Sequence, residues 1–208
     1  MKIVVPDLGL SNLWSARRAL ESLGHEVVLA ASPEPVASAP FIVLPGVGAF
    51  AEASRRLAAT GIGDAVREAA ARGSAVLGIC LGMQLLFESS EEGGDAPGLG
   101  LLPGRVTRLE GGAPVPHVGW NRITPTSRGV SLFGNGGSAE RYLYFVHSYV
   151  ARPASEDLVL AHCVHGESFP AAVGKGSSLG FQFHPEKSGE PGVRFLGAAI
   201  SLISGGRN

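Results

Sequence analysis

The sequence predicts an α/β fold: a mostly parallel central sheet flanked by helices, with an antiparallel β extension. In the first half of the chain, short apolar runs alternate with stretches of helical periodicity, which indicates a parallel sheet covered on both faces. In the second half, strand-like runs are separated by turn residues instead of helices, which is typical of antiparallel pairing. The 208 residues suffice for one domain, residues 1–208, with a substantial core.

The first half is expected to supply the parallel strands, in the apolar runs 2–5, 26–30, 41–44 and 75–77. Ser11 is the predicted N-cap of a helix that runs to about Leu23, and further helices are expected near 51–59 and 62–72. Ligands of such sheets bind at the carboxyl ends of the strands. The glycine-rich loop 45–50 and Cys80 both follow strands at that edge.

The second half is expected to add strands at 105–109, 120–123, 142–150, 158–164, 171–173 and 179–183, and a closing helix at 193–203. Residues 89–100 are rich in Glu, Gly, Pro and Ser, so they predict an exposed loop. Residues 127–141 predict a second loop, rich in Gly, Ser and Asn, with one apolar anchor at Leu132 and Phe133.

The composition narrows the class of protein. Charged residues make up 17% of the chain and apolar residues 45%, and the formal net charge is -1. This balance implies no broad attraction to nucleic acid or anionic lipid, so we expect a small-molecule or protein partner. Two cysteines are too few for a disulfide framework, and no run resembles a signal peptide or a membrane span. We therefore expect a soluble cytoplasmic protein.

Cys80 stands at a predicted corner between a buried strand and a helix. Gly78 and Gly82 flank it in the spacing of the G-x-S-x-G nucleophile elbow, with a thiol in place of the hydroxyl. Side chains at the two glycines would collide as the backbone turns, and the following helix N-terminus favours a thiolate. Taken alone, however, a buried cysteine is more often an inert, small apolar residue.

A nucleophilic cysteine needs a base, and the base needs an orienting group. His184 ends an apolar run, Pro185 favours an extended backbone there, and Glu186 would point to the same side as the ring. A carboxylate in that place stabilises an imidazolium. His-Pro-Glu is equally compatible with an ordinary turn that carries a surface carboxylate.

The glycine-rich turn 45–48 also has two interpretations. Its backbone N–H groups can serve a developing oxyanion, or it can be a tight strand-to-helix connection. The cluster of His162, Cys163 and His165 does not predict a metal site, since His162 would face away from the other two and a structural site needs four convergent ligands. We expect no metal, and we expect His25 and Cys163 to be structural.

Two segments, Gly-Ile-Cys-Leu-Gly-Met-Gln at 78–84 and Gln-Phe-His-Pro-Glu at 182–186, resemble the class I, or triad, glutamine amidotransferases. Further segments narrow the resemblance to the glutaminase subunits of imidazole glycerol phosphate synthase. They are Pro-Gly-Val-Gly-Ala-Phe at 45–50, Gly-Leu-Gly-Leu-Leu-Pro-Gly at 98–104, Pro-His-Val-Gly-Trp-Asn at 116–121, Tyr-Phe-Val-His-Ser-Tyr at 144–149 and His-Pro-Glu-Lys-Ser at 184–188. The third and the last of these are far more specific than the elbow, and the resemblance spans essentially the whole chain.

The resemblance implies a flavodoxin-like glutaminase that hydrolyses L-glutamine to glutamate and ammonia without a cofactor. The ammonia would pass to a (β/α)8-barrel cyclase subunit in a heterodimer. The joint reaction would make imidazole glycerol phosphate and aminoimidazole carboxamide ribotide, a step of L-histidine biosynthesis.

The same resemblance implies roles for individual residues. Cys80 would be the nucleophile, His184 the base and then the acid, and Glu186 the group that orients the ring. The backbone N–H groups of Val47 and Leu81 would form the oxyanion hole. Glutamine would be held by Gly46, Gly48, Gln84, His147, Ser148 and Tyr149. The partner interface would include Asn12, Trp120 and Asn121.

Two positions differ from the family pattern: His165 stands where relatives often have an aromatic residue, and Phe181 where a smaller residue is common. Three alternatives remain. An amidotransferase subunit of the anthranilate or aminodeoxychorismate type would usually carry a histidine in place of Met83 and lack the motif at 117–121. A cysteine hydrolase acting alone would need no ammonia acceptor. A binding protein without activity is disfavoured because Cys80, His184 and Glu186 are all present.

Overall fold

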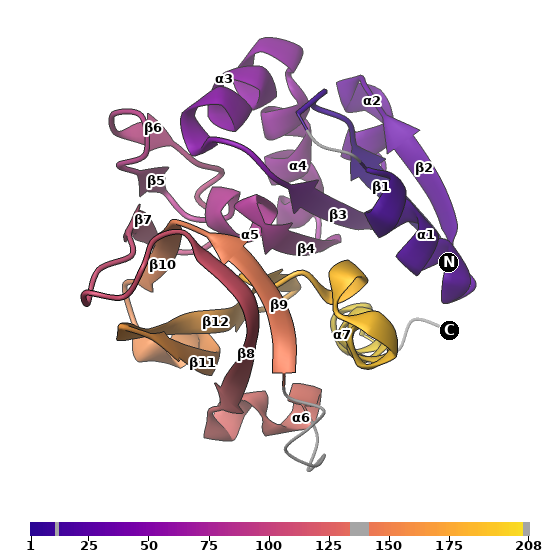
Figure 1. Ribbon diagram of the computed structural model, residues 1–208. Helices are drawn as coiled ribbons and strands as arrows, with labels where there is room; N and C mark the ends of the chain where they lie inside the picture. The colour runs from indigo at the N-terminus through magenta and orange to yellow at the C-terminus, as the bar shows by residue number, and fades with distance from the viewer. Residues whose placement is uncertain (11–12, 134–141, 206–208) are drawn as a thin grey trace.

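The computed structural model describes residues 1–10, 13–133 and 142–205. Within these ranges the molecule is built around one large sheet, which helices flank (Figure 1). Five strands form a parallel region: β1 (Lys2–Pro6), β2 (Glu26–Ala30), β3 (Phe41–Gly46), β4 (Ala75–Cys80) and β13 (Ser178–Phe181). Their order is β2-β1-β3-β4-β13, with every adjacent pair parallel. The four N-terminal strands confirm the predicted apolar runs.

Four further strands extend this sheet beyond β13: β12 (Glu167–Lys175), β11 (Val159–His165), β8 (His117–Pro125) and β9 (Tyr142–His147). Each pairs antiparallel with its neighbour. The predicted α/β class with an antiparallel extension is therefore confirmed.

A second, smaller sheet lies beside the first and was not predicted. Its order is β10-β7-β5-β6, from β10 (Tyr149–Pro153), β7 (Gly104–Arg108), β5 (Ser89–Ser90) and β6 (Ala96–Pro97). The predicted single strand 142–150 is wrong, because the chain leaves the large sheet at Ser148 and continues in the small one. Ser148 O accepts a hydrogen bond from Leu109 N at 2.8 Å, at the end of β7. The predicted loop 89–100 contains two very short strands.

Helices cover both faces of the parallel region. They are α1 (Trp14–Ser22), α2 (Pro33–Ala37), α3 (Phe50–Thr60), α4 (Ile62–Ala71), α5 (Leu81–Leu85) and α7 (Gly189–Ile203). Helix α1 begins at Trp14 with Leu13 as its N-cap, so the predicted cap is two residues too early. Ser11 and Asn12 lie outside the described residues. Helix α7 begins four residues earlier than expected.

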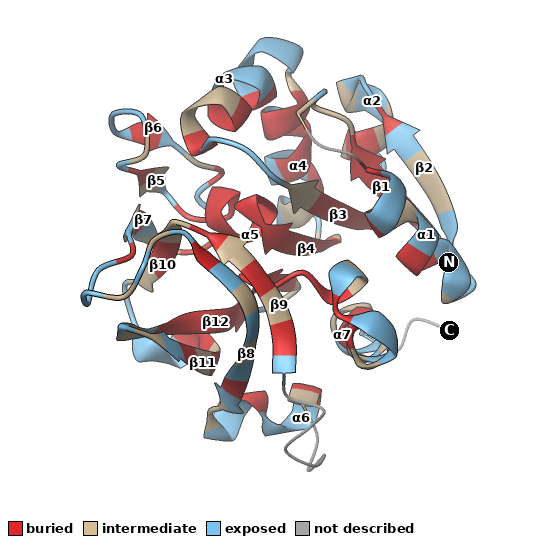
Figure 2. Cartoon of the chain, in the orientation of Figure 1, coloured by how far each residue is buried: buried red, intermediate tan, exposed pale blue. Residues whose placement is uncertain are grey.

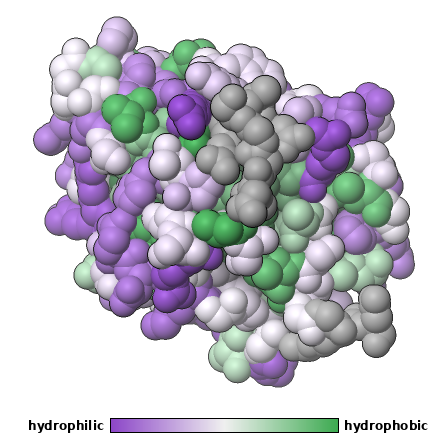
Figure 3. Space-filling view, turned by 90° about the horizontal axis from the view of Figure 1, so that it is seen from below, coloured by the Kyte–Doolittle hydropathy of each residue, from purple (hydrophilic) through white to green (hydrophobic). Residues whose placement is uncertain are grey.

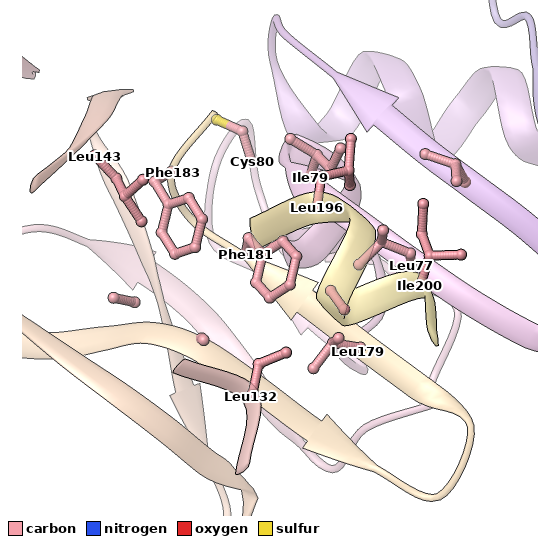
Figure 4. Close-up of a cluster of buried hydrophobic side chains, with 14 of the residues drawn as sticks. Leu77, Ile79, Cys80, Leu132, Leu143, Leu179, Phe181, Phe183, Leu196 and Ile200 are labelled. Atoms are coloured by element: carbon pink, nitrogen blue, oxygen red, sulfur yellow. The ribbon is translucent and has the colours of Figure 1, made fainter. Parts of the chain in front are cut away.

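Alternate residues of the strands build two cores. Ile3 and Val5 of β1 pack with α1 and α7, while Val4 packs on the opposite face, with the helices α2 to α5. Figure 2 shows the central strands as almost continuously buried, as expected of a parallel sheet with two covered faces. In the first core, the Phe181 ring stacks on Phe183 with centroids 5.0 Å apart, near Leu196 of α7 (Figure 4). The large residue at position 181 therefore fills core space behind the site.

Residues 127–133 are helical where a loop was predicted. A short 3-10 helix (Ser127–Gly129) leads into α6 (Val130–Phe133). The predicted apolar anchor is present: Leu132 is 4% exposed, and the Phe133 ring stacks on Phe195 of α7 with centroids 4.6 Å apart. The remainder of the predicted loop, 134–141, lies outside the described residues.

No helix within the described ranges combines the length and apolar character needed to span a bilayer. Figure 3 shows small hydrophobic groups separated by hydrophilic residues on the face that it views.

Candidate active site

Cys80 occupies a sharp corner where β4 ends and α5 begins at the next residue. Its φ of 54° is positive, which is uncommon for a residue other than glycine and marks local strain. A Cβ at Gly78 would lie 2.5 Å from Gly82 O, and a Cβ at Gly82 would overlap the Leu44 carbonyl of β3. The predicted corner is thus present, and both flanking positions require glycine for steric reasons.

His184 and Glu186 form a buried pair just beyond β13. His184 Nδ1 lies 2.7 Å from Glu186 Oε1, and the two side chains are 2% and 7% exposed. Because the carboxylate accepts the Nδ1 hydrogen, Nε2 is the ring atom left for chemistry, and it is buried without a hydrogen-bond partner. The predicted turn is present, because Pro185–Lys187 form a short 3-10 helix where an extended backbone was expected, but its carboxylate is not at the surface. The prediction of a paired ring is confirmed.

The charge state of His184 depends on both of its neighbours. Burial lowers its pKa, but interactions with Cys80 and with the Glu186 carboxylate outweigh burial and raise the pKa to about 9. The ring is consequently protonated at neutral pH when the sulfur is ionised. A base that holds a proton beside a sulfur can later deliver that proton to a leaving group.

The Cys80 sulfur opens into a cavity of about 240 Å³ that gathers segments from across the chain. The elbow contributes Cys80, Leu81 and Gln84, the loop after β3 contributes Val47 and Gly48, and the β9–β10 connection contributes residues 147–149. The remaining lining residues are Glu92, Pro116 and Val146. Eight of the predicted catalytic, oxyanion and substrate-binding residues therefore share one cavity.

His184 and Glu186 line a neighbouring cavity of about 160 Å³ together with Gly46 and Val47. Val47 lines both cavities and is 38% exposed, and Gly48 has a φ of 115°, a value that favours glycine. The loop at 46–48 thus borders both the cavity at the thiol and the cavity at the imidazole. A Cβ at Gly46 would lie 2.9 Å from Leu81 Cβ, so this loop packs directly on the elbow.

Three side chains of the site were not assigned roles from the sequence. Gln182 is fully buried and its Nε2 lies 3.7 Å from Cys80 Sγ. A signal existed, because Gln182 and His184 share a side of an extended, otherwise apolar run. Glu92 comes from the loop treated as exposed, and its Oε2 accepts a hydrogen bond from Phe50 N at 2.8 Å. His117 contacts His147 behind the cavity, and nothing in its local sequence indicated this.

The predicted interface positions differ in their surroundings. Trp120 is 55% exposed and makes an edge contact with the Tyr144 ring. The Asn121 side chain instead points inward, where its Nδ2 lies 3.1 Å from His117 Nε2 and donates to Val164 O at 2.9 Å. Asn12 lies outside the described residues.

The other histidines and Cys163 have structural surroundings. His165, one of the two positions that differ from the family pattern, stacks on the His117 ring with centroids 4.1 Å apart. Its ring therefore packs behind the wall of the cavity. His162 Nε2 lies 2.6 Å from Glu156 Oε1. Cys163 is 1% exposed, and burial raises the pKa of its thiol to about 12, which makes it unreactive at neutral pH.

Comparisons of the sequence and of the fold with known proteins agree on one family. A sequence profile of the family described as glutamine amidotransferase class-I matches residues 4–197. The chain is 48% identical to the imidazole glycerol phosphate synthase subunit HisH of Symbiobacterium thermophilum, over 94% of this chain and 91% of that protein. It is 45% identical to the subunit of the same name from Geobacillus kaustophilus, over 99% of both chains. A crystal structure of a glutamine amidotransferase superposes with a TM-score of 0.73 at 23% identity, over 97% of this chain and 98% of the other, which supports the fold.

Proposed function

The chain belongs to the class-I glutamine amidotransferase family and, within it, to the HisH subunits of imidazole glycerol phosphate synthase, and on this premise we propose that Cys80, His184 and Glu186 form its catalytic triad. The observation that carries the proposal is the placement of a strained, pocket-facing cysteine beside a buried histidine whose Nδ1 is held by a carboxylate. The large sheet draws strands from both ends of the chain, which supports a single catalytic domain.

The triad hydrolyses the glutamine side-chain amide in two steps. In the first, the Cys80 sulfur attacks the amide carbon, and the imidazolium of His184 protonates the nitrogen as the C–N bond breaks, so that ammonia leaves. In the second, His184 removes a proton from water, which attacks the γ-glutamyl thioester. The C–S bond then breaks, glutamate leaves, and the thiolate–imidazolium pair is restored.

Backbone groups on two sides of the cavity are suited to the oxyanion of each step. The Leu81 N–H belongs to the first residue of α5, and Val47 lies in the loop across the cavity. Donors aimed at a developing oxyanion in a dry site typically contribute about 3 kcal/mol each. We assign the oxyanion hole to these two N–H groups.

The rest of the cavity suits the amino-acid end of glutamine. Gly46, Gly48, Gln84 and the connection formed by His147, Ser148 and Tyr149 are the proposed substrate contacts. The Gln84 amide nitrogen is already bonded to Tyr149 O at 2.9 Å, so its oxygen is the atom available to substrate. Glu92 adds a carboxylate to the lining, which matches the charge of an α-ammonium group.

The loop at 46–48 is proposed to gate the reaction. Its glycines allow the Val47 peptide to reorient at low cost, and the loop borders the cavities of both Cys80 and His184. The oxyanion donor would then be in place only when the partner subunit carries its nucleotide ligand. Glutaminase rates of the free chain, of the complex and of the ligand-loaded complex test this, and a free chain as fast as the loaded complex would exclude gating.

The relatives are named as subunits of a synthase, so this chain acts with a partner subunit. We assign the partner as a (β/α)8-barrel cyclase that receives ammonia in a heterodimer and makes imidazole glycerol phosphate and aminoimidazole carboxamide ribotide. Trp120 is the proposed contact with the largest exposed aromatic surface, and Asn12 and Asn121 are the other proposed interface positions. A cytoplasmic location follows from this biosynthetic role.

The alternatives are distinguished by the same observations. Relatives at 44–48% identity that carry the HisH name favour this subunit over one of the anthranilate type. A hydrolase acting alone would release all of its ammonia to solvent, so capture of the nitrogen in the synthase product separates it from a subunit that transfers ammonia.

The triad is tested by trapping the thioester. Acid quenching of the complex during turnover with glutamine, followed by peptide mass analysis, should show a γ-glutamyl adduct on the peptide that contains Cys80. Cys163 serves as the internal control because it is buried and its thiol pKa is raised to about 12. An adduct that persists in a Cys80→Ala variant would overturn the assignment.

A further inference from the structure

We propose that Gln182 is a catalytic residue that donates a hydrogen bond to the sulfur of Cys80, and that Gln84 and the Tyr149 carbonyl fix the direction of its amide. This inference rests on the proposed role of Cys80 as the nucleophile. It adds to the triad a side chain that contacts the reacting sulfur itself.

Gln182 is held firmly in place. It follows β13 directly, is 0% exposed, and its backbone N donates to Ala171 O at 3.0 Å. Its Nε2 lies 3.7 Å from Cys80 Sγ, a hydrogen-bond distance for sulfur. Its Oε1 lies 3.2 Å from Gln84 Nε2. Both ends of the buried amide are therefore occupied.

The direction of the amide follows from one main-chain carbonyl. Tyr149 O can only accept, so the Gln84 group that lies 2.9 Å from it must be the NH₂ group. The same NH₂ group lies next to the Gln182 amide, which must therefore turn its oxygen toward Gln84. The Gln182 NH₂ group is then left facing the sulfur. This series of hydrogen bonds has one consistent direction, from Tyr149 O through the two glutamines to Cys80.

The sulfur has two polar neighbours with opposite preferences. Val146 O lies 3.7 Å from Sγ and can only accept, so it favours the neutral S–H form. The Gln182 N–H can only donate to sulfur in this orientation, so it favours the thiolate. When the proton moves to His184, the contact with Val146 O loses its donor and Gln182 becomes the main hydrogen-bond partner of the charged sulfur.

The same donor acts twice in the reaction cycle. It stabilises the attacking thiolate before the thioester forms, and it stabilises the sulfur as a leaving group when the C–S bond breaks. A hydrogen bond to a charged group is worth more than one between neutral groups. Loss of Gln182 should therefore reduce kcat more than it changes the KM for glutamine.

The experiment measures how fast iodoacetamide alkylates Cys80 as a function of pH, in the complex with the partner subunit. Gln182→Met keeps the volume and removes the donor, so the midpoint of the alkylation profile should move upward by about one pH unit, and kcat should fall about tenfold. Gln84→Met leaves the Gln182 donor in place but removes the contact that fixes the direction of its amide. The midpoint of the alkylation profile should therefore move upward by a smaller amount. The double variant should shift no further than Gln182→Met, because both changes act through one contact.

Ser178→Ala on β13 is the control for disturbance of the strand, since Ser178 is buried, with 8% of its surface exposed, and lies outside both cavities. An unshifted alkylation profile in Gln182→Met and Gln84→Met would overturn the inference and give Gln182 a purely structural role. Full activity of Cys80→Ala would instead overturn the proposed function, so the two failures are distinguishable. Mass analysis of the labelled peptides confirms that Cys80 is the residue measured.

Discussion

His117 Nδ1 lies 3.0 Å from His147 Nε2, and this contact joins the wall of the cavity at Cys80 to strand β8. His147 Nδ1 lies 3.1 Å from Tyr149 O, which can only accept, so Nδ1 carries the hydrogen and Nε2 accepts. His117 must then donate from Nδ1 and accept at Nε2 from the Asn121 amide. The chain of hydrogen bonds is complete only when both rings are neutral.

Protonation of this pair should destabilise the protein in acid. Burial, with a smaller effect of nearby histidine charge, lowers the pKa of His117 to about 4 and that of His147 to about 3, from 6.5. Between pH 6.5 and these values the unfolded chain binds protons that the folded chain does not. The free energy of unfolding should therefore decrease as the pH is lowered, by about 1.4 kcal/mol per pH unit for each ring.

Urea unfolding between pH 6.5 and 5 measures this slope. In His117→Gln one of the two rings is absent, so the slope should decrease by about 1.4 kcal/mol per pH unit. A variant with the wild-type slope would show that His117 is not held neutral by the fold.

Removing the charge of Glu186 should impair catalysis without removing its hydrogen bond. In Glu186→Gln the amide oxygen can still accept from His184 Nδ1, but the pKa of His184 should fall below about 9 because a carboxylate no longer raises it. We expect kcat to fall by about 10³-fold, since an uncharged orienting group poorly supports the imidazolium.

The stability of this variant should change in a defined pH window. The raised pKa of His184 gives a stabilisation that is complete below pH 6.5 and is lost as the pH rises through about 9. The difference in unfolding free energy between wild type and Glu186→Gln should therefore be largest near pH 6 and shrink above pH 9. Glu190→Gln, which alters an exposed pair with Arg194, is the control. Equal effects of the two substitutions on kcat would contradict the assigned role.

Gly82→Ala should destabilise the elbow, because the added Cβ would overlap the Leu44 carbonyl of β3. Overlap with main chain forces a backbone shift that typically costs about 3 kcal/mol. Gly63→Ala on α4 is the matched control, as its Cβ would lie 3.4 Å from the nearest atoms and alanine favours a helix. Thermal or urea unfolding of both variants checks this, and similar stabilities would contradict the steric argument.

Trp120→Ala should weaken association with the partner subunit. An exposed tryptophan at an interface commonly contributes about 2 kcal/mol, or about a thirtyfold change in Kd. Leu29→Ala is the control, since Leu29 is also exposed, at 41%, but lies on β2 at the opposite edge of the large sheet. Titration with the partner measures both, and unchanged binding by Trp120→Ala would remove this residue from the interface.

The parallel half of the fold could be predicted because its strands are uniformly apolar and its helices are periodic. Helix α2 was not predicted; it is only five residues long and begins at Pro33, and proline is compatible with the first turn of a helix. The break at Ser148 was missed because residues on both sides favour strands, and only the position of β7 draws the second part into another sheet.

The candidate site was predictable where short segments carry distinctive spacing. The elbow and the His184–Glu186 pair follow from local patterns, and the structure places them at neighbouring cavities. The direction of the Gln182 amide could not be predicted, because it depends on the Tyr149 carbonyl, 33 residues away in sequence, and on the side chain of Gln84 in α5. The His117–His147 contact likewise arises only from the register of β8 with β9, which pairs these two residues directly.

The measurement that tests the central claim most directly is synthesis by the reconstituted complex of the Cys80→Ala variant with its partner, supplied in turn with glutamine and with ammonia. We predict that glutamine no longer supports synthesis and that added ammonia supports it at the wild-type rate. Continued synthesis from glutamine would contradict the assignment of Cys80 as the nucleophile that supplies ammonia.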